Sequence, residues 1–185
     1  MVEAFLTSTS LVALAEVGDK TQLLAFALAA RFRRPAPIIA AIAIATLANH
    51  ALAASLGVWI AGFFTPQTLR WTVGLAFLGF GAWTLIPDRP GALPASSRTG
   101  VFLTTLIAFF LAEMGDKTQF ATIALAARFH APVIVTVGTT VGMLLANVPA
   151  VLLGERLAGR LSFKAIRRLA AALFFVTGLV TLWMA

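Results

Sequence analysis

One eight-residue stretch occurs twice in the sequence. Residues 15–22 are Ala-Glu-Val-Gly-Asp-Lys-Thr-Gln, and residues 112–119, which lie 97 positions further on, are Ala-Glu-Met-Gly-Asp-Lys-Thr-Gln. The similarity continues at the same offset, because Ala-Leu-Ala-Ala-Arg-Phe occupies both 27–32 and 124–129. A match of this length predicts an internal repeat in which the two halves of the chain form the same unit.

The composition indicates that these units lie in a lipid bilayer. Of the 185 residues, 60% are hydrophobic and 11% are charged, and the mean hydropathy is +0.95, so there is too little polar surface to cover a soluble core. The net charge of +7 comes from basic residues between apolar segments, which favours topology signals over a nucleic-acid partner. The chain has no cysteine, so disulfides and thiolate metal ligands are excluded.

We therefore expect an all-α membrane protein with six transmembrane helices, since apolar runs of about 20 residues are long enough to cross the hydrocarbon layer. The predicted helices are 4–30, 36–62, 68–86, 100–127, 132–154 and 165–184. Residues 1–87 form the first three-helix repeat, 88–99 a linker and 100–185 the second repeat, within a single transmembrane domain. Because each unit has an odd number of helices, the second enters the membrane from the opposite side, and the repeats are inverted.

The basic residues between the helices predict the orientation. Ten of them fall on one side of the membrane and two on the other, and by the positive-inside rule the ten face the cytoplasm. The ten are Arg31, Arg33, Arg34, Arg89, Arg98, Arg156, Arg160, Lys164, Arg167 and Arg168, and the two are Arg70 and Arg128. Both termini are then outside, which is the periplasmic side if the membrane is a bacterial inner membrane. Residues 155–168 are expected to form either a short interfacial helix or a solvated basic loop.

The repeated motif places ionisable groups in the middle of the first and fourth predicted helices. Such groups cost a few kcal/mol each at that depth, so they should face the interior of the bundle and one another. On a continuous helix, the glutamate, aspartate and lysine of each motif share one face. We expect four metal ligands at the centre of the membrane: Glu16, Asp19, Glu113 and Asp116. A hard oxygen site of this kind suits Ca²⁺, Mn²⁺ or Mg²⁺.

Other residues support this predicted site. Lysines offset two of the four negative charges, amide side chains offer further oxygens, threonines complete the motifs, and glycines remove bulk or free a carbonyl group. The supporting residues are Lys20, Lys117, Gln22, Gln119, Asn49, Asn147, Thr21, Thr118, Gly18 and Gly115. A buried carboxylate cluster also holds protons tightly, so a metal ion can displace protons on one side of the membrane and protons the metal on the other. His50 is a ligand, a proton relay or a packing residue.

Duplicated E-x-G-D-[KR]-[ST] motifs in a small six-helix protein resemble the Gdt family of Ca²⁺/Mn²⁺ transporters. Both copies are complete here, at Glu16–Thr21 and Glu113–Thr118, and the resemblance covers essentially the whole chain. It implies a proton-coupled exporter in which Mn²⁺, or Ca²⁺, is the transported substrate, with no prosthetic group. The short loops and compact size indicate a bacterial inner membrane.

Three alternatives remain beside this interpretation. An intramembrane aspartyl protease carries G-x-G-D and a second aspartate after a tyrosine, whereas this chain has glutamate at the first position and no tyrosine. The sequence therefore predicts no enzyme. An exporter of another small cationic solute would also use four carboxylates. A passive cation channel would transport ions regardless of a proton gradient.

Overall fold

A computed structural model describes residues 1–87, 100–153 and 163–183, and all regular structure in these ranges is helical. Four helices lie within two residues of the predicted bounds: α3 (Pro35–Ala61), α4 (Pro66–Thr84), α7 (Pro132–Leu153) and α9 (Phe163–Trp183). Three of them begin at a proline, which fits the first turn of a helix because the N–H that it lacks would have no partner there. The predicted linker 88–99 and most of the segment 155–168 lie outside the described residues.

The other two predicted helices are each broken at the repeated motif. Residues 4–30 were expected to form one helix but form α1 (Val2–Glu16) and α2 (Lys20–Phe32), and residues 100–127 form α5 (Gly100–Glu113) and α6 (Lys117–Phe129). The prediction of continuous helices was wrong, and so was the shared helical face derived from it. The reason is the backbone of Gly18 and Gly115, whose φ angles of 84° and 74° belong to the left-handed region and end the preceding helix.

The helices have the length and surface of membrane-spanning elements. Among the described residues, α3, α7 and α9 are long and apolar enough to cross a membrane, and α5 is a shorter apolar helix. Large apolar side chains such as Leu52, Leu145 and Leu179 are more than half exposed. A surface of this kind suits a lipid environment. The chain is an all-α membrane protein.

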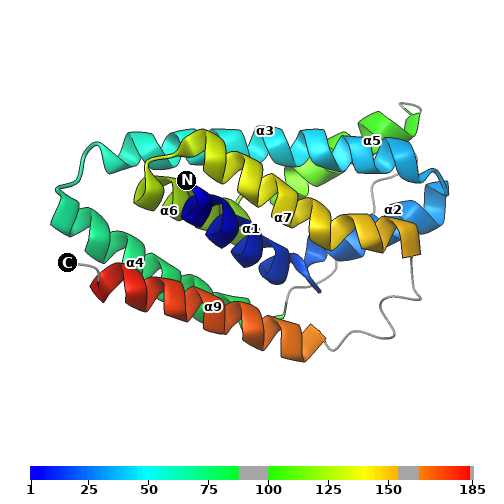
Figure 1. The fold of residues 1–185 in the computed structure, drawn as a ribbon. Helices are drawn as coiled ribbons and strands as arrows, with labels where there is room; N and C mark the ends of the chain where they lie inside the picture. The colour runs from blue at the N-terminus through cyan, green and yellow to red at the C-terminus, as the bar shows by residue number, and fades with distance from the viewer. Residues whose placement is uncertain (88–99, 154–162, 184–185) are drawn as a thin grey trace.

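Helices from the two halves of the chain interleave. Figure 1 shows α3 and α7 running in opposite directions through the bundle, with α4 and α9 as a second antiparallel pair along one side. Helix α1 packs on α7, and α5 packs on α3. Helices α1 and α7 approach closely, because a Cβ on Gly142 of α7 would lie 2.6 Å from the carbonyl oxygen of Thr9 in α1. Each broken segment therefore packs on a long helix of the other half.

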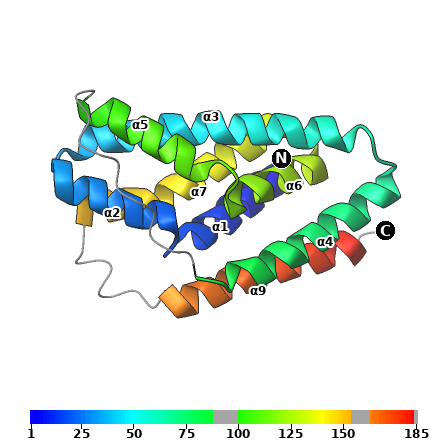
Figure 2. The ribbon, with the colours of Figure 1, turned by 180° about the vertical axis from the view of Figure 1, so that it is seen from behind.

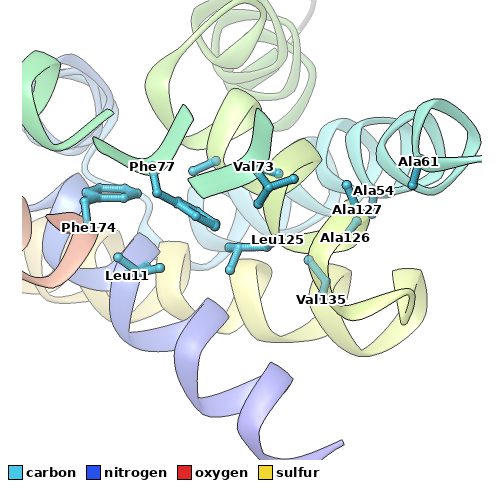
Figure 3. Packing of buried hydrophobic residues seen from close by; sticks show 12 residues of the cluster. Leu11, Ala54, Ala61, Val73, Phe77, Leu125, Ala126, Ala127, Val135 and Phe174 are labelled. Carbon is cyan, nitrogen blue, oxygen red and sulfur yellow. The ribbon is translucent and has the colours of Figure 1, made fainter. Parts of the chain in front are cut away.

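Two clusters of buried apolar residues occupy opposite ends of the bundle. The first cluster joins α1 and α6 to the α4–α9 pair through Val73, Phe77 and Phe174, which point inward beside Leu11 and Leu125 (Figure 3). The second cluster is built from α2, α3, α5 and α7. Its buried members are Ala25, Leu28, Ile38, Ile42, Ala45, Phe109, Ala150 and Val151. No described residue of α4 or α9 belongs to the second cluster, so the pair packs against one end of the bundle.

Candidate metal centre

Acidic side chains from both helix breaks meet in the interior of the bundle. Oxygen atoms of Glu16, Asp19 and Asp116 all lie within 4.8 Å of one another. None of the three residues is more than 3% exposed. The first two belong to the break between α1 and α2, and the third to the break between α5 and α6. Carboxylates this close and this buried repel one another unless protons or a cation neutralise them.

The fourth predicted ligand, Glu113, lies beside this triad. It is fully buried and interacts electrostatically with Asp19 and Asp116. The hydroxyl of Thr118 donates a hydrogen bond to Glu113 Oε2 at 3.4 Å and also lies close to the carboxylate of Glu16. One threonine therefore lies between the glutamates of the two halves, and the acidic cluster extends from the triad to Glu113.

The helix ends concentrate polar groups around these carboxylates. Glu16 is the last residue of α1, and Asp19 caps α2 by accepting the backbone N–H of Lys20 at 2.8 Å. Asp116 occupies the same position before α6. Helix N-termini stabilise negative charge, whereas the last carbonyl groups of α1 and α5 lack helical partners. A broken helix thus brings both carboxylates and backbone oxygens to the middle of the bundle.

Glutamine side chains hold both breaks in shape. The Oε1 atom of Gln22 accepts the backbone N–H of Gly18 at 2.9 Å, and Oε1 of Gln119 accepts that of Gly115 at 2.7 Å. Thr21 donates a hydrogen bond to Glu16 across the first break, as Thr118 does to Glu113 across the second. These bonds fix the backbone where the glycines turn.

The same glutamines also tie each break to the other half of the chain. The amide nitrogen of Gln22 donates to the carbonyl oxygen of Ala146 in α7 at 2.9 Å, and that of Gln119 donates to Oδ1 of Asn49 in α3 at 3.1 Å. The amide oxygens of Gln22, Gln119 and Asn49 therefore accept hydrogen bonds from the protein itself. Of the four amide side chains expected to offer an oxygen to the ion, Asn147 is the one whose Oδ1 is buried without a hydrogen-bond partner among the described residues.

Gly115 acts through the backbone and not by removing bulk. A Cβ on Gly115 would meet nothing within 4 Å, so close packing does not explain this residue. Its positive φ does, because L-residues adopt that conformation at a cost of about 1–2 kcal/mol. The expectation that bulk is the constraint is wrong for Gly115.

The two motif lysines have different surroundings. The Lys20 ammonium lies 3.3 Å from Oδ1 of Asp116, so this ion pair joins the first break to the second. Its side chain is 28% exposed and that of Asp116 is 3% exposed. Lys117 is buried, donates to the carbonyl oxygen of Ile86 at 3.4 Å and lies over the ring of Trp83. The second break is thereby linked to the end of α4.

Comparison with known proteins shows the family to which this chain belongs. The family model described as "Divalent cation/proton antiporter GDT1" matches residues 4–92 and 101–185. The chain belongs to the GDT1 family. A protein of Vibrio cholerae serotype O1 with the name "Putative manganese exporter" is 52% identical over 94% of this chain and 88% of its own length. "GDT1-like protein sll0615" of Synechocystis is 28% identical over 99% of this chain and 98% of its own length. No solved structure matches the chain.

Membership of the GDT1 family makes the chain a multi-pass membrane transporter of divalent cations and not an enzyme. In this family the metal ion is a transported substrate and no prosthetic group is indicated. The protease alternative is therefore excluded.

The sequence reasoning missed two features of this GDT1 family member. The first is the helix break, although its signal was present: glycine, then aspartate at the cap, then glutamine three residues later resembles a capping box. The second is the contact of Lys117 with α4, which no local pattern indicates, because its partner is a backbone carbonyl far away in sequence.

Proposed function

We propose that this chain exports Mn²⁺ from the cytoplasm in exchange for protons, and that the buried carboxylates of the two helix breaks bind the ion. The observation that carries the proposal is the convergence of Glu16, Asp19 and Asp116, with Glu113 beside them. Carboxylate oxygens suit Mn²⁺ and Ca²⁺. The name of the Vibrio cholerae relative, 52% identical to this chain, supports manganese.

The proposed topology has six crossings in two inverted repeats. The α1–α2 and α5–α6 segments each cross once as a broken helix, and α3, α4, α7 and α9 supply the other four crossings. The unusual backbone positions support the repeat: positive φ angles occur at Gly18 and Arg33 and again, 97 residues later, at Gly115 and His130. The two ranges matched by the family model also begin 97 residues apart, at 4 and 101. The opposite directions of α3 and α7 in Figure 1 support inversion.

The proposed orientation follows the basic residues. With the Arg-rich segments in the cytoplasm, α2 and α5 are the cytoplasmic half-helices and α1 and α6 are the external ones. Both termini then face the periplasm, and the membrane is the inner membrane of a bacterium.

In this orientation, the α4–α9 pair packs on the external half-helices. Figure 2 shows the pair lying along α1 and α6, and the first apolar cluster fills that contact. The second cluster, at the cytoplasmic end, contains no described residue of the pair. We take this arrangement as closed toward the periplasm. Exchanging the roles of the two repeats would pack the pair against α2 and α5 and close the cytoplasmic end, which is how inverted repeats produce alternating access.

Charge balance accounts for the exchange with protons. Four carboxylates and two lysines leave two negative charges, which one divalent ion or two protons neutralise. Ion and protons then compete for the same oxygens, because neither the empty charged cluster nor a doubly occupied one is favourable in a membrane interior. Release of the metal on one side is thus coupled to proton uptake.

Transport by the purified protein in proteoliposomes tests the proposal. An imposed pH gradient should drive Mn²⁺ movement, and collapsing the gradient should abolish it. Movement that ignores the gradient would indicate a passive channel. A protein that moves neither Mn²⁺ nor Ca²⁺ would leave the exporter of another cationic solute as the better interpretation.

Neutral variants of the four carboxylates test the site itself. Glu16→Gln, Asp19→Asn, Glu113→Gln and Asp116→Asn should each reduce Mn²⁺ transport at least about tenfold, because each removes a charged ligand. The matched control is Glu3→Gln in the first turn of α1, where the side chain is 65% exposed. The control should transport normally and should restore growth in manganese to a bacterium that lacks its own exporter. Site variants that restored growth equally well would show that the ion binds elsewhere.

A further inference from the structure

His50 is a buried histidine that the site as proposed above does not use. It lies in α3, is fully buried, and places Nε2 3.9 Å from Oε2 of Glu113. Neither ring nitrogen has a hydrogen-bond partner among the residues that the structure describes. Burying such a group unpaired costs about 1–3 kcal/mol, which an apolar side chain of similar size would avoid. Packing alone therefore does not account for a histidine here.

The equivalent position in the second half has the same property. Asn147 follows His50 by the repeat offset of 97 residues and is also fully buried. Its amide nitrogen donates to the carbonyl oxygen of Met143 at 3.1 Å, whereas Oδ1 has no partner in the described part of the chain. Each half thus presents a buried atom with an open lone pair at this position. The atom is an imidazole nitrogen in one half and an amide oxygen in the other.

The distance between His50 and Glu113 fits a shared cation. Two ligand atoms that each lie about 2.1–2.5 Å from one ion can be as far as about 4–5 Å apart. The observed 3.9 Å falls inside this range and is too long for a hydrogen bond. Oε2 of Glu113 also accepts the hydroxyl of Thr118, whereas Oε1 is buried without a partner among the described residues, so the carboxylate has a second oxygen to give.

We propose that His50 binds the transported ion through a ring nitrogen, together with Glu113, and thereby selects a divalent transition-metal ion over Ca²⁺ and Mg²⁺. This inference rests on the proposed function, since it names a further ligand of the same ion. Ca²⁺ and Mg²⁺ take oxygen ligands, whereas first-row transition metals accept imidazole nitrogen as well. The carboxylates attract any divalent ion, and the ring nitrogen of His50 favours transition-metal ions over Ca²⁺ and Mg²⁺.

Pulsed electron paramagnetic resonance of the wild-type protein loaded with Mn²⁺ tests the ligand directly. A bound imidazole should give ¹⁴N modulation of the Mn²⁺ signal, and labelling the histidines with ¹⁵N should change it. The chain has only two histidines, so His130→Asn is a matched control that should keep the modulation. His50→Asn, which copies the residue at 147, and His50→Gln should lose it.

Transport tests the selectivity. The ratio of Mn²⁺ to Ca²⁺ transport should fall at least about tenfold in His50→Asn and stay unchanged in His130→Asn. Bound Mn²⁺ without nitrogen modulation in the wild type would overturn the inference and leave the proposed function intact. An unchanged ratio in both His50 variants would overturn it too. A wild-type protein that neither binds nor moves Mn²⁺ would refute the proposed function itself.

Discussion

Replacing Gly115 by alanine separates backbone strain from every other effect at the second helix break. The φ angle of 74° disfavours an L-residue by about 1–2 kcal/mol, and the new Cβ would meet nothing within 4 Å, so no clash adds to this cost. Gly100 is the matched control, because its φ is 81° and its Cβ would also meet nothing. Both alanine variants should lose about 1–2 kcal/mol in the free energy of unfolding, a decrease of about 2–8 °C in melting temperature.

Only the Gly115 variant should lose transport. A change of φ at the break moves Glu113 and Asp116 relative to each other, and misplacement by about 1 Å at a reacting centre can cost a hundredfold. Thermal unfolding in detergent and initial rates of Mn²⁺ transport in proteoliposomes measure the two effects. Gly115→Asn should keep more transport, since asparagine tolerates positive φ. Equal transport by Gly115→Ala and Gly100→Ala would refute the idea that the break positions the carboxylates.

Two more predictions follow from contacts of the second break. Gln119→Leu removes the hydrogen bonds that brace this break and should lower the free energy of unfolding by about 1–3 kcal/mol in thermal melts, whereas the exposed Gln67→Leu should not. The rings of Trp83 in α4 and Phe120 in α6 have centroids 6.2 Å apart. The chain has no cysteine of its own, so a Trp83→Cys, Phe120→Cys double variant can be cross-linked at these two positions by a short, cleavable thiol reagent. Joining them should stop transport and cleavage should restore it, and export by the cross-linked protein would contradict the alternating packing of α4 and α9.

Four of the six predicted helices could be placed because their limits are local. Pro35, Pro66 and Pro132 begin α3, α4 and α7, and a proline at a helix start acts without help from distant residues. The breaks were missed because the prediction placed each motif in the middle of one span, with apolar residues before and after it. A single glycine is compatible with a continuous helix, and the aspartate and glutamine that follow it, which resemble a capping box, were interpreted as site residues and not as a helix start.

The carboxylate cluster was predictable in outline and not in detail. The position of the motif in the middle of two predicted helices, and its duplication, were enough to predict that Glu16, Asp19 and Asp116 lie close together. The roles of the amide side chains depend on which helix lies opposite each of them: Gln119 meets Asn49 only because α6 packs on α3. The sequence left the role of His50 open for the same reason, since nothing near it in the chain shows that Glu113 is its neighbour.

The contacts that cross between the halves bear on how the protein is made. Lys20 pairs with Asp116, and Gln22 donates to Ala146, so the polar groups of the first break find their partners in a segment that is synthesised later. Until then, a newly inserted first half holds several ionisable groups in the bilayer, each at a cost of about 2.5–3.5 kcal/mol by translocon measurements. Helices α1 and α2, at 15 and 13 residues, are also too short to span a membrane alone. We therefore expect membrane insertion of the first half to be completed only when the second half arrives.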